Sequence, residues 1–290
     1  MSRFPIERKA LLFGLLMLVA IGVMAMFHYR ALSDYQLQGQ LRLLVRDIES
    51  NILTLRRNEK DFLARKDLIY QQRFDDHFRT VQAYVRELRF GLEAHQVEKT
   101  KIDQLDEALE TYRDRFHTMV KLQQEIGFNH EDGLYGRMRS AIHRVEDILQ
   151  AQRQDQLLKD MLMLRRHEKD FMLRHEMKYS EKFDEAMSLM RADLSGSYMY
   201  EGVRSDIVDV LAAYEQDFKA LTMATQRMGL SSDEGLHGQM RGSIHKGEEI
   251  LNELRQKTVS LESDAGSHMI NQIIAFAVLL TILTGTLIRL

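Results

Sequence analysis

The chain contains no cysteine, so disulfide bonds, thiolate metal sites and cysteine nucleophiles are excluded. Only one proline is present, Pro5, and everything beyond the first few residues therefore lacks the strongest helix breaker. Neither sign of charge dominates, because the formal net charge is -3, and nucleic acid is not expected as a partner. The absence of cysteine also suits an oxidising compartment, where free thiols are a liability.

Motifs of common enzyme classes are missing as well. The sequence has no Gly-rich phosphate loop, no His-Glu-x-x-His zinc signature and no recognisable pair of nucleophile and base. It is rich in Leu, Met, Gln, Glu, Lys and Arg, which favour helices. We therefore expect an all-α protein that is not an enzyme and needs no cofactor.

Two long apolar runs lie near the ends of the chain. Residues 10–27 contain no charged side chain and are long enough to cross a hydrocarbon core of about 30 Å as a helix. A second run, Met269 to Ile288, defines another membrane helix at 268–290. A cleaved signal peptide is the rival interpretation of the first run, but no convincing small-x-small site precedes His28.

Basic side chains flank the two runs on one side of the predicted membrane. They are Arg3, Arg8, Lys9 and Arg289. The positive-inside rule therefore places residues 1–9 in the cytoplasm and residues 28–267 outside.

The outer segment contains an internal repeat. Residues 55–62, Leu-Arg-Arg-Asn-Glu-Lys-Asp-Phe, return at 164–171 as Leu-Arg-Arg-His-Glu-Lys-Asp-Phe. Residues 133–143, Gly-Leu-Tyr-Gly-Arg-Met-Arg-Ser-Ala-Ile-His, return at 235–245 as Gly-Leu-His-Gly-Gln-Met-Arg-Gly-Ser-Ile-His. A duplicated helical unit between two membrane anchors is more typical of a sensor than of an enzyme.

Apolar positions from Leu41 onward step by three and four, the pattern of a bundle helix. Two membrane anchors require an even number of helical passes between them. We therefore interpret the glycine-acid segments 127–133 and 229–235 as kinks inside long helices, and we place an extra turn at 150–155. The six predicted helices, two long and four short, are 28–66, 67–91, 97–150, 155–175, 177–195 and 199–267.

The expected fold is two stacked four-helix bundles between the two transmembrane helices. A proximal module would comprise about 28–127 plus 233–267, and a distal module about 131–229.

Glu59 and Glu168 occupy positions that the helical spacing reserves for core residues, where a carboxylate must be paired or protonated. At ~1.5 Å per residue, Glu59 falls level with Arg241, and Glu168 with Arg139, so each bundle should mix the two repeats. The candidate ligand-binding residues are Arg56, Glu59, Lys60, Tyr112, Phe116, Arg241 and His245 around the first glutamate, and Arg165, Glu168, Lys169, Tyr214, Phe218, Arg139 and His143 around the second.

These charged layers allow more than one interpretation. A surplus of cationic groups could hold a small organic anion, whereas the same layer could only fix the register between helices. The aromatic residues could belong to the core rather than to a pocket. Metal binding is a third hypothesis, because His143-x-x-Glu146 is repeated at 245–248, but carboxylate-bridged bundles use the reverse order. No metal ligands are assigned.

Together, the paired blocks at 55–62 and 133–143 and their copies resemble the helical bimodular sensor domain of bacterial methyl-accepting chemotaxis receptors, which also occurs in some sensor histidine kinases. The resemblance covers the outer segment and both anchors. It implies a homodimer in the inner (cytoplasmic) membrane, a periplasmic sensor domain of two stacked bundles, and a potential ligand site in each module. By position, Arg56 and Arg165 would hold the carboxylates of small organic acids.

This chain departs from the family pattern at Glu59 and Glu168, where some members carry a further basic residue. The lower positive charge makes an amino acid a second ligand class. A receptor of this family would continue past Leu290 into a HAMP relay and a signalling hairpin, so the output is expected from a cytoplasmic module or a partner. The alternatives are the input domain of a sensor histidine kinase and a ligand-free helical tether.

Overall fold

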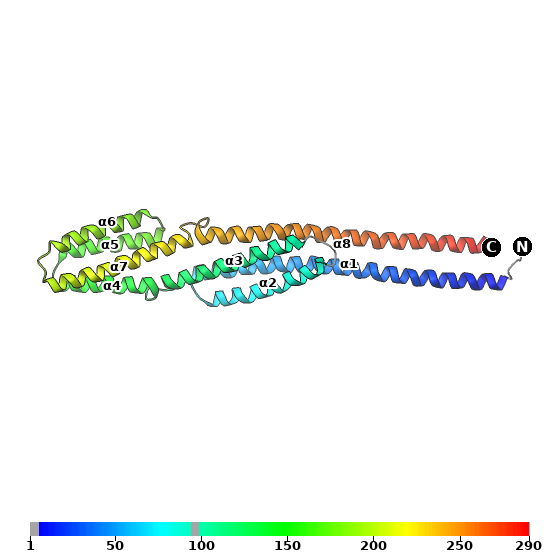
Figure 1. The fold of residues 1–290 in the computed structure, drawn as a ribbon, viewed down its shortest axis with the longest axis horizontal. Helices are drawn as coiled ribbons and strands as arrows, with labels where there is room; N and C mark the ends of the chain where they lie inside the picture. The colour runs from blue at the N-terminus through cyan, green and yellow to red at the C-terminus, as the bar shows by residue number, and fades with distance from the viewer. Residues whose placement is uncertain (1–5, 94–98, 290) are drawn as a thin grey trace. The chain divides into compact units, whose positions relative to one another are not determined.

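A computed structural model describes residues 6–93 and 99–289, and this part of the chain is all-helical (Figure 1). The helices are α1 (Ile6–Arg65), α2 (Ile69–Glu93), α3 (Lys99–Ile126), α4 (Gly133–Ala151), α5 (Asp155–Arg174), α6 (Lys178–Ser195), α7 (Glu201–Met228) and α8 (Gly235–Arg289). The all-α prediction is confirmed.

The chain divides into two compact units, each built from separated stretches of sequence. Unit 1 contains the chain up to Leu53, residues 79–106 and the chain from Glu248 onward. Unit 2 contains residues 54–78 and 107–247.

Both copies of both repeated blocks thus lie wholly within unit 2, and the site described below is built from this unit alone.

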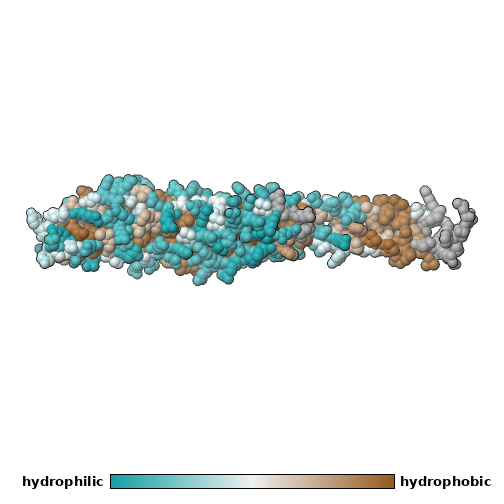
Figure 2. All heavy atoms as spheres, viewed as in Figure 1, coloured by the Kyte–Doolittle hydropathy of each residue, from teal (hydrophilic) through white to brown (hydrophobic). Residues whose placement is uncertain are grey.

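The two apolar runs lie in α1 and α8, each of which continues without interruption into the polar part of the chain. Both helices are long and apolar enough to cross a membrane. Large apolar side chains along these runs are exposed, for example Leu11 at 74% and Ile282 at 58%. Figure 2 shows hydrophobic residues gathered over these segments. The structure therefore contains two candidate membrane spans at the predicted positions, and Leu290 lies outside the described residues.

Most of the predicted helix boundaries are confirmed within the described residues, and the predicted helix start at residue 97 lies outside them. Helices end or begin at the expected breaks near 65–69, 174–178 and 195–201. The turn predicted at 150–155 separates α4 from α5 although it contains neither glycine nor proline. Arg153 makes this turn with a φ of 53°, a left-handed conformation that a side chain adopts at some cost in free energy.

The prediction of six helices is wrong for the described residues, because the two long predicted helices 97–150 and 199–267 are each interrupted. Helix α3 ends at Ile126 before α4 begins, and α7 ends at Met228 before α8 begins. Both loops open and close with glycine in the left-handed region. The φ values are 111° at Gly127 and 54° at Gly133 in the first loop, and 115° at Gly229 and 54° at Gly235 in the second. These conformations break the helical hydrogen-bond ladder, so the segments are loops rather than kinks.

The second glycine of each Gly-x-x-Gly motif lies directly beneath its loop. A Cβ atom at Gly136 would lie 2.0 Å from the carbonyl oxygen of Glu131, and one at Gly238 would lie 2.1 Å from that of Asp233. Since no side chain fits at such distances, the repeated motif is explained by close packing of loop against helix.

The two repeats have matching aromatic cores inside unit 2. Phe116 of α3 packs against Phe74 of α2 with ring centroids 4.2 Å apart, and Phe218 of α7 packs against Phe183 of α6 at 4.0 Å. Helices α4 to α7 contact one another in a closed ring, α4 with α5 and α7, and α6 with α5 and α7. The core of this four-helix arrangement therefore holds the second charged block in place.

Within unit 1, ion pairs join helices that are distant in sequence. Arg42 of α1 pairs with Glu262 of α8 at 3.1 Å, and Lys101 of α3 pairs with Glu253 of α8 at 2.6 Å. These pairs are partly exposed, so each contributes little to stability by itself.

We predict that Gly136→Ala and Gly238→Ala each destabilise the protein by about 1–3 kcal/mol, because the added methyl group overlaps a loop carbonyl. Gly242 is the matched control, since a Cβ atom there meets nothing within 4 Å. Gly242→Ala, in the interior of α8, should instead stabilise by up to about 1 kcal/mol. Chemical denaturation followed by circular dichroism measures all three, and equal effects at Gly238 and Gly242 would contradict the steric explanation.

Candidate functional site

Two clefts of similar size occur in unit 2, each beside one of the repeated glutamates. The Glu59 cleft has a volume of about 560 Å³, and the Glu168 cleft has a volume of about 510 Å³. The Glu59 cleft is lined by Arg56, Glu59, Lys60, Leu63, His175, Gly229, Leu230, Ser231, Ser232, His237, Arg241 and Ile244. The Glu168 cleft is lined by Lys66, Phe128, Asn129, His130, Tyr135, Arg139, Ile142, His143, Arg165, Glu168, Lys169 and Met172.

The linings of the two clefts correspond under the internal repeat at every position except Gly229 in one cleft and His143 in the other. Arg56, Glu59 and Lys60 on α1 match Arg165, Glu168 and Lys169 on α5. Arg241 on α8 matches Arg139 on α4. The same helical spacing therefore builds the same charged floor twice.

Each cleft takes its glutamate and its Gly-x-x-Gly helix from different copies of the repeat. Glu59, from the first charged block, shares a cleft with Arg241 from the second glycine block. Glu168, from the second charged block, shares a cleft with Arg139 from the first glycine block. The pairing predicted from heights along the helices is confirmed.

A tyrosine from the facing helix holds each glutamate. The hydroxyl of Tyr112 on α3 donates a hydrogen bond to Glu59, and the hydroxyl of Tyr214 on α7 donates to Oε2 of Glu168 at 2.6 Å. Lys169 Nζ donates to Oε1 of Glu168, also at 2.6 Å. Glu168 is only 4% exposed, so these two donors satisfy a carboxylate that is almost removed from water.

In each of the two tyrosine–glutamate hydrogen bonds, burial shifts the pKa of one partner. Burial raises the pKa of Glu59, opposed by the Tyr112 hydrogen bond and by the charges of Arg56 and Lys60. Burial raises the pKa of Tyr214 well above its ordinary value, and the negative charge of Glu168 adds to the effect. Tyr214 is therefore a neutral hydrogen-bond donor at any physiological pH.

Arg165, a predicted carboxylate-binding residue, also contacts a carboxylate of the protein. Its Nη1 lies 3.4 Å from Oε2 of Glu146 on α4, and His143 Nδ1 lies 3.2 Å from the same oxygen. The side chain of Arg165 is 29% exposed, so part of its guanidinium faces the cleft. The guanidinium of Arg165 is therefore already paired with a carboxylate of the protein.

Two cleft residues that sequence reasoning missed are the residues that terminate α1 and α5. Lys66 and His175 both have a φ of 53°, the left-handed conformation that glycine or asparagine usually occupies at a helix end. Lys66 follows the helix of the Glu59 cleft but lines the Glu168 cleft, whereas His175 follows the helix of the Glu168 cleft but lines the Glu59 cleft. Their matched positions in the repeat are the signal that could have identified them.

The two clefts have different titratable side chains at one matching position of the repeat. His237 in the Glu59 cleft has its pKa lowered by burial and then by the nearby His175. Its counterpart in the Glu168 cleft is Tyr135, whose pKa is raised by burial and by Glu168. Nζ of Lys66 lies 5.5 Å from the centroid of the Tyr135 ring, within range of a cation–π contact, and burial lowers its pKa.

Some of the predicted site residues lie beside the clefts rather than in their walls. Tyr112, Phe116, Tyr214 and Phe218 are fully buried in the core, and the two tyrosines reach the site only through their hydroxyl groups. His143 lines the Glu168 cleft, whereas its counterpart His245 is exposed and does not line the Glu59 cleft.

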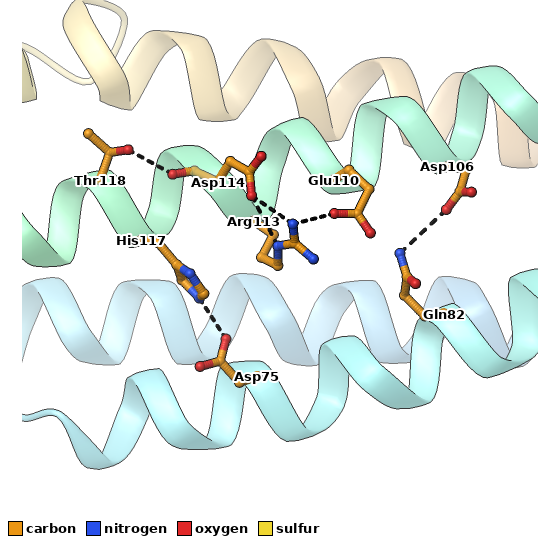
Figure 3. A network of polar contacts seen from close by, with 8 residues as sticks. All are labelled: Asp75, Gln82, Asp106, Glu110, Arg113, Asp114, His117 and Thr118. Atoms are coloured by element: carbon orange, nitrogen blue, oxygen red, sulfur yellow. Dashed lines mark hydrogen bonds and ion pairs between the residues drawn. The ribbon is translucent and has the colours of Figure 1, made fainter.

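A separate polar network lies on α2 and α3 and contributes to neither cleft (Figure 3). Nε2 of His117 lies 2.7 Å from Oδ1 of Asp75, and the matching pair in the second repeat, Lys219 and Asp184, lies 3.8 Å apart. Arg113 pairs with Glu110 at 2.5 Å and with Asp114 at 2.8 Å. The His117–Asp75 contact joins α3 to α2, whereas both pairs of Arg113 lie within α3, outside either cleft.

Among the described residues, no three His, Asp or Glu side chains are grouped so that they could hold a metal ion. No protein-family model matches the chain, and no curated protein matches it. The arrangement of charge in the two clefts is therefore the main guide to function.

We predict that Tyr214→Phe lowers the free energy of unfolding by about 1.5–3 kcal/mol, because it removes a hydrogen bond to a buried charged group. Tyr112→Phe should act in the same direction on Glu59. Tyr198→Phe is the control, since Tyr198 is fully exposed. Urea denaturation at neutral pH measures the three variants, and an unchanged midpoint for Tyr214→Phe would show that the hydrogen bond does not hold Glu168.

Proposed function

We propose that the protein is a transmembrane sensor that binds a small organic acid or amino acid outside the membrane. The observation that supports this most directly is the surplus of cationic side chains around one carboxylate in each cleft. Arg56, Lys60 and Arg241 surround Glu59. Lys66, Arg139, Arg165 and Lys169 surround Glu168. Such a surplus favours an anionic ligand, which would share Arg241 with Asp233 and Arg165 with Glu146, the carboxylates that these arginines already contact.

The glutamates give the proposed ligand a second point of recognition. Arginine can hold a carboxylate by two parallel hydrogen bonds. A carboxylate oxygen of Glu59 or Glu168 can accept a hydrogen bond from an amine or a hydroxyl group of the ligand. An amino acid or a hydroxy acid would therefore use both kinds of contact, and a simple acid would use the arginines.

The proposed architecture is a helical bimodular sensor domain, of two stacked four-helix bundles in the periplasm, in a homodimer anchored in the inner membrane. The resemblance of the repeated blocks to chemotaxis receptors supports this assignment. Helix α8 would transmit the signal, because it carries Arg241 in the Glu59 cleft and continues unbroken through the second apolar run. A ligand can shift this helix only if it binds one of its positions more tightly than another. The output would come from a cytoplasmic signalling module or a partner, of the chemotaxis or the histidine kinase type.

The first test is calorimetric titration of the full chain in detergent with C2 to C6 organic acids and amino acids. We expect Arg165→Ala to weaken binding in the Glu168 cleft, and Arg56→Ala to weaken it in the Glu59 cleft, each by at least about ten-fold. Arg113→Ala is the matched control, because this arginine lies in the surface network of Figure 3. Affinities that both cleft variants retain would overturn the proposed site.

A ligand-free structural tether is the second candidate function. It is favoured by the contacts that each glutamate already makes inside the protein, notably those of Glu168 with Tyr214 and Lys169. Under this alternative the charged layers fix helix register, and no acid or amine at saturating concentration raises the melting temperature. A reproducible shift of several degrees would exclude it.

We predict that anions bind the Glu59 cleft more tightly as pH falls from about 7 to about 5, because a histidine with a pKa below its ordinary ~6.5 gains a proton in this range. The lowered pKa of His237 leaves its imidazole neutral at neutral pH, and protonation adds a positive charge beside the ligand. The raised pKa of Glu59 acts in the same direction, because protonation removes a negative charge. Titrations at several pH values use the Arg165→Ala variant, because it weakens binding in the Glu168 cleft and leaves the Glu59 cleft to be measured. Adding His237→Gln should reduce the change of affinity with pH. If the affinity changes with pH equally in the His237→Gln variant, protonation of His237 is not the cause.

A further inference from the structure

The two clefts share the groups that would hold a carboxylate but differ at the positions that would touch the rest of a ligand. The shared groups are the arginine, glutamate and lysine of the charged block and the arginine of the glycine block. At two other positions the Glu168 cleft has Phe128 and Tyr135, where the Glu59 cleft has Leu230 and His237. The clefts also differ where Lys66 corresponds to His175, but the two aromatic positions are the ones that bear on the shape of a ligand.

Both aromatic side chains are fixed in position by the surrounding structure. The ring of Phe128 lies 6.5 Å from that of the buried Phe62 in a T-shaped arrangement, with the planes at 89°, and its side chain is partly exposed. Tyr135 lies between Gly133 and Gly136, the two glycines that pack against the loop, and Lys66 approaches its ring. Rings held in this way lose little conformational entropy when a ligand binds.

A planar aromatic ligand would make contacts here that an aliphatic one cannot. Ring pairs in stacked or edge-to-face geometry contribute stabilisation beyond their buried area. The ammonium group of Lys66 adds a cation that can face a ligand ring as well as that of Tyr135. A cleft of about 510 Å³ has room for a single substituted ring with its carboxylate directed toward Arg139 and Arg165.

We propose that the Glu168 cleft selects planar aromatic carboxylates through Phe128 and Tyr135, whereas the Glu59 cleft does not distinguish them from saturated acids. This inference rests on the proposed function, because it requires that the clefts bind organic acids. Phe128 and Tyr135 are then specificity-determining residues, and the arginines supply the affinity common to both clefts.

The test compares benzoate with cyclohexanecarboxylate, which has the same charge and ring size but no aromatic system. Calorimetric titration uses the full chain in detergent, with Arg241→Ala to weaken the Glu59 cleft. We expect benzoate to bind about two- to ten-fold more tightly, the ratio that corresponds to a ring-pair contribution. Arg139→Ala should weaken the binding of both acids.

Exchange of the aromatic residues between clefts provides matched variants. Phe128→Leu with Tyr135→His gives the Glu168 cleft the residues of its counterpart, and it should remove the preference while cyclohexanecarboxylate still binds. The reciprocal pair, Leu230→Phe with His237→Tyr, should create a preference for benzoate in the Glu59 cleft when Arg139→Ala weakens the other. Circular dichroism of each variant verifies that it is folded.

The outcomes separate this inference from the proposed function. Equal affinity for the two acids, with binding that still depends on Arg139, overturns the aromatic selectivity and leaves the sensor proposal standing. A preference for benzoate that survives the Phe128 and Tyr135 exchange also overturns it. If neither these acids nor aliphatic dicarboxylates bind saturably to the unmodified chain, both proposals are overturned.

Discussion

The arrangement of both clefts depends on a carboxylate that is placed on the core side of a helix and must be satisfied there. Glu168 is almost completely buried, and it is held by a tyrosine hydroxyl from one neighbouring helix and by the lysine that follows it. Without such donors, a buried carboxylate would destabilise the bundle or take up a proton. The need to hold this carboxylate explains why the aromatic core includes a tyrosine at that level.

The internal repeat produces two such clefts, and each one combines residues from both copies of the repeat. Each charged block faces the glycine block of the other copy, so neither copy of the repeat could complete a cleft by itself. The glycines of the motif belong to the same arrangement, because they let the loops at 127–133 and 229–235 lie close against α4 and α8. The loops in turn supply residues such as Phe128 and Leu230 to the cleft walls.

Much of this could be predicted from sequence, because it depends on helical periodicity and on rise per residue. The positions of most helix ends, the facing pairs Glu59 with Arg241 and Glu168 with Arg139, and the levels of Tyr112 and Tyr214 all follow from counting residues along rods. The glycine segments were harder, since glycine is compatible with a kink, a cap or a loop, and only the φ values distinguish these. Lys66 and His175 escape prediction because residues with side chains are uncommon in the left-handed conformation, and periodicity does not indicate where the chain points after a helix ends.

The crossed helix ends have a thermodynamic implication. The last turns of α1 carry Arg56, Glu59 and Lys60 into one cleft, and the residue that terminates the same helix, Lys66, lines the other. In the same way, α5 carries Glu168 in the second cleft, and His175, which terminates α5, lines the first. Any ligand that displaces the end of either helix therefore alters a wall of the second cleft. Under the proposed function, such a ligand would couple the two clefts, and by reciprocity each bound ligand would change the affinity of the other cleft by the same factor.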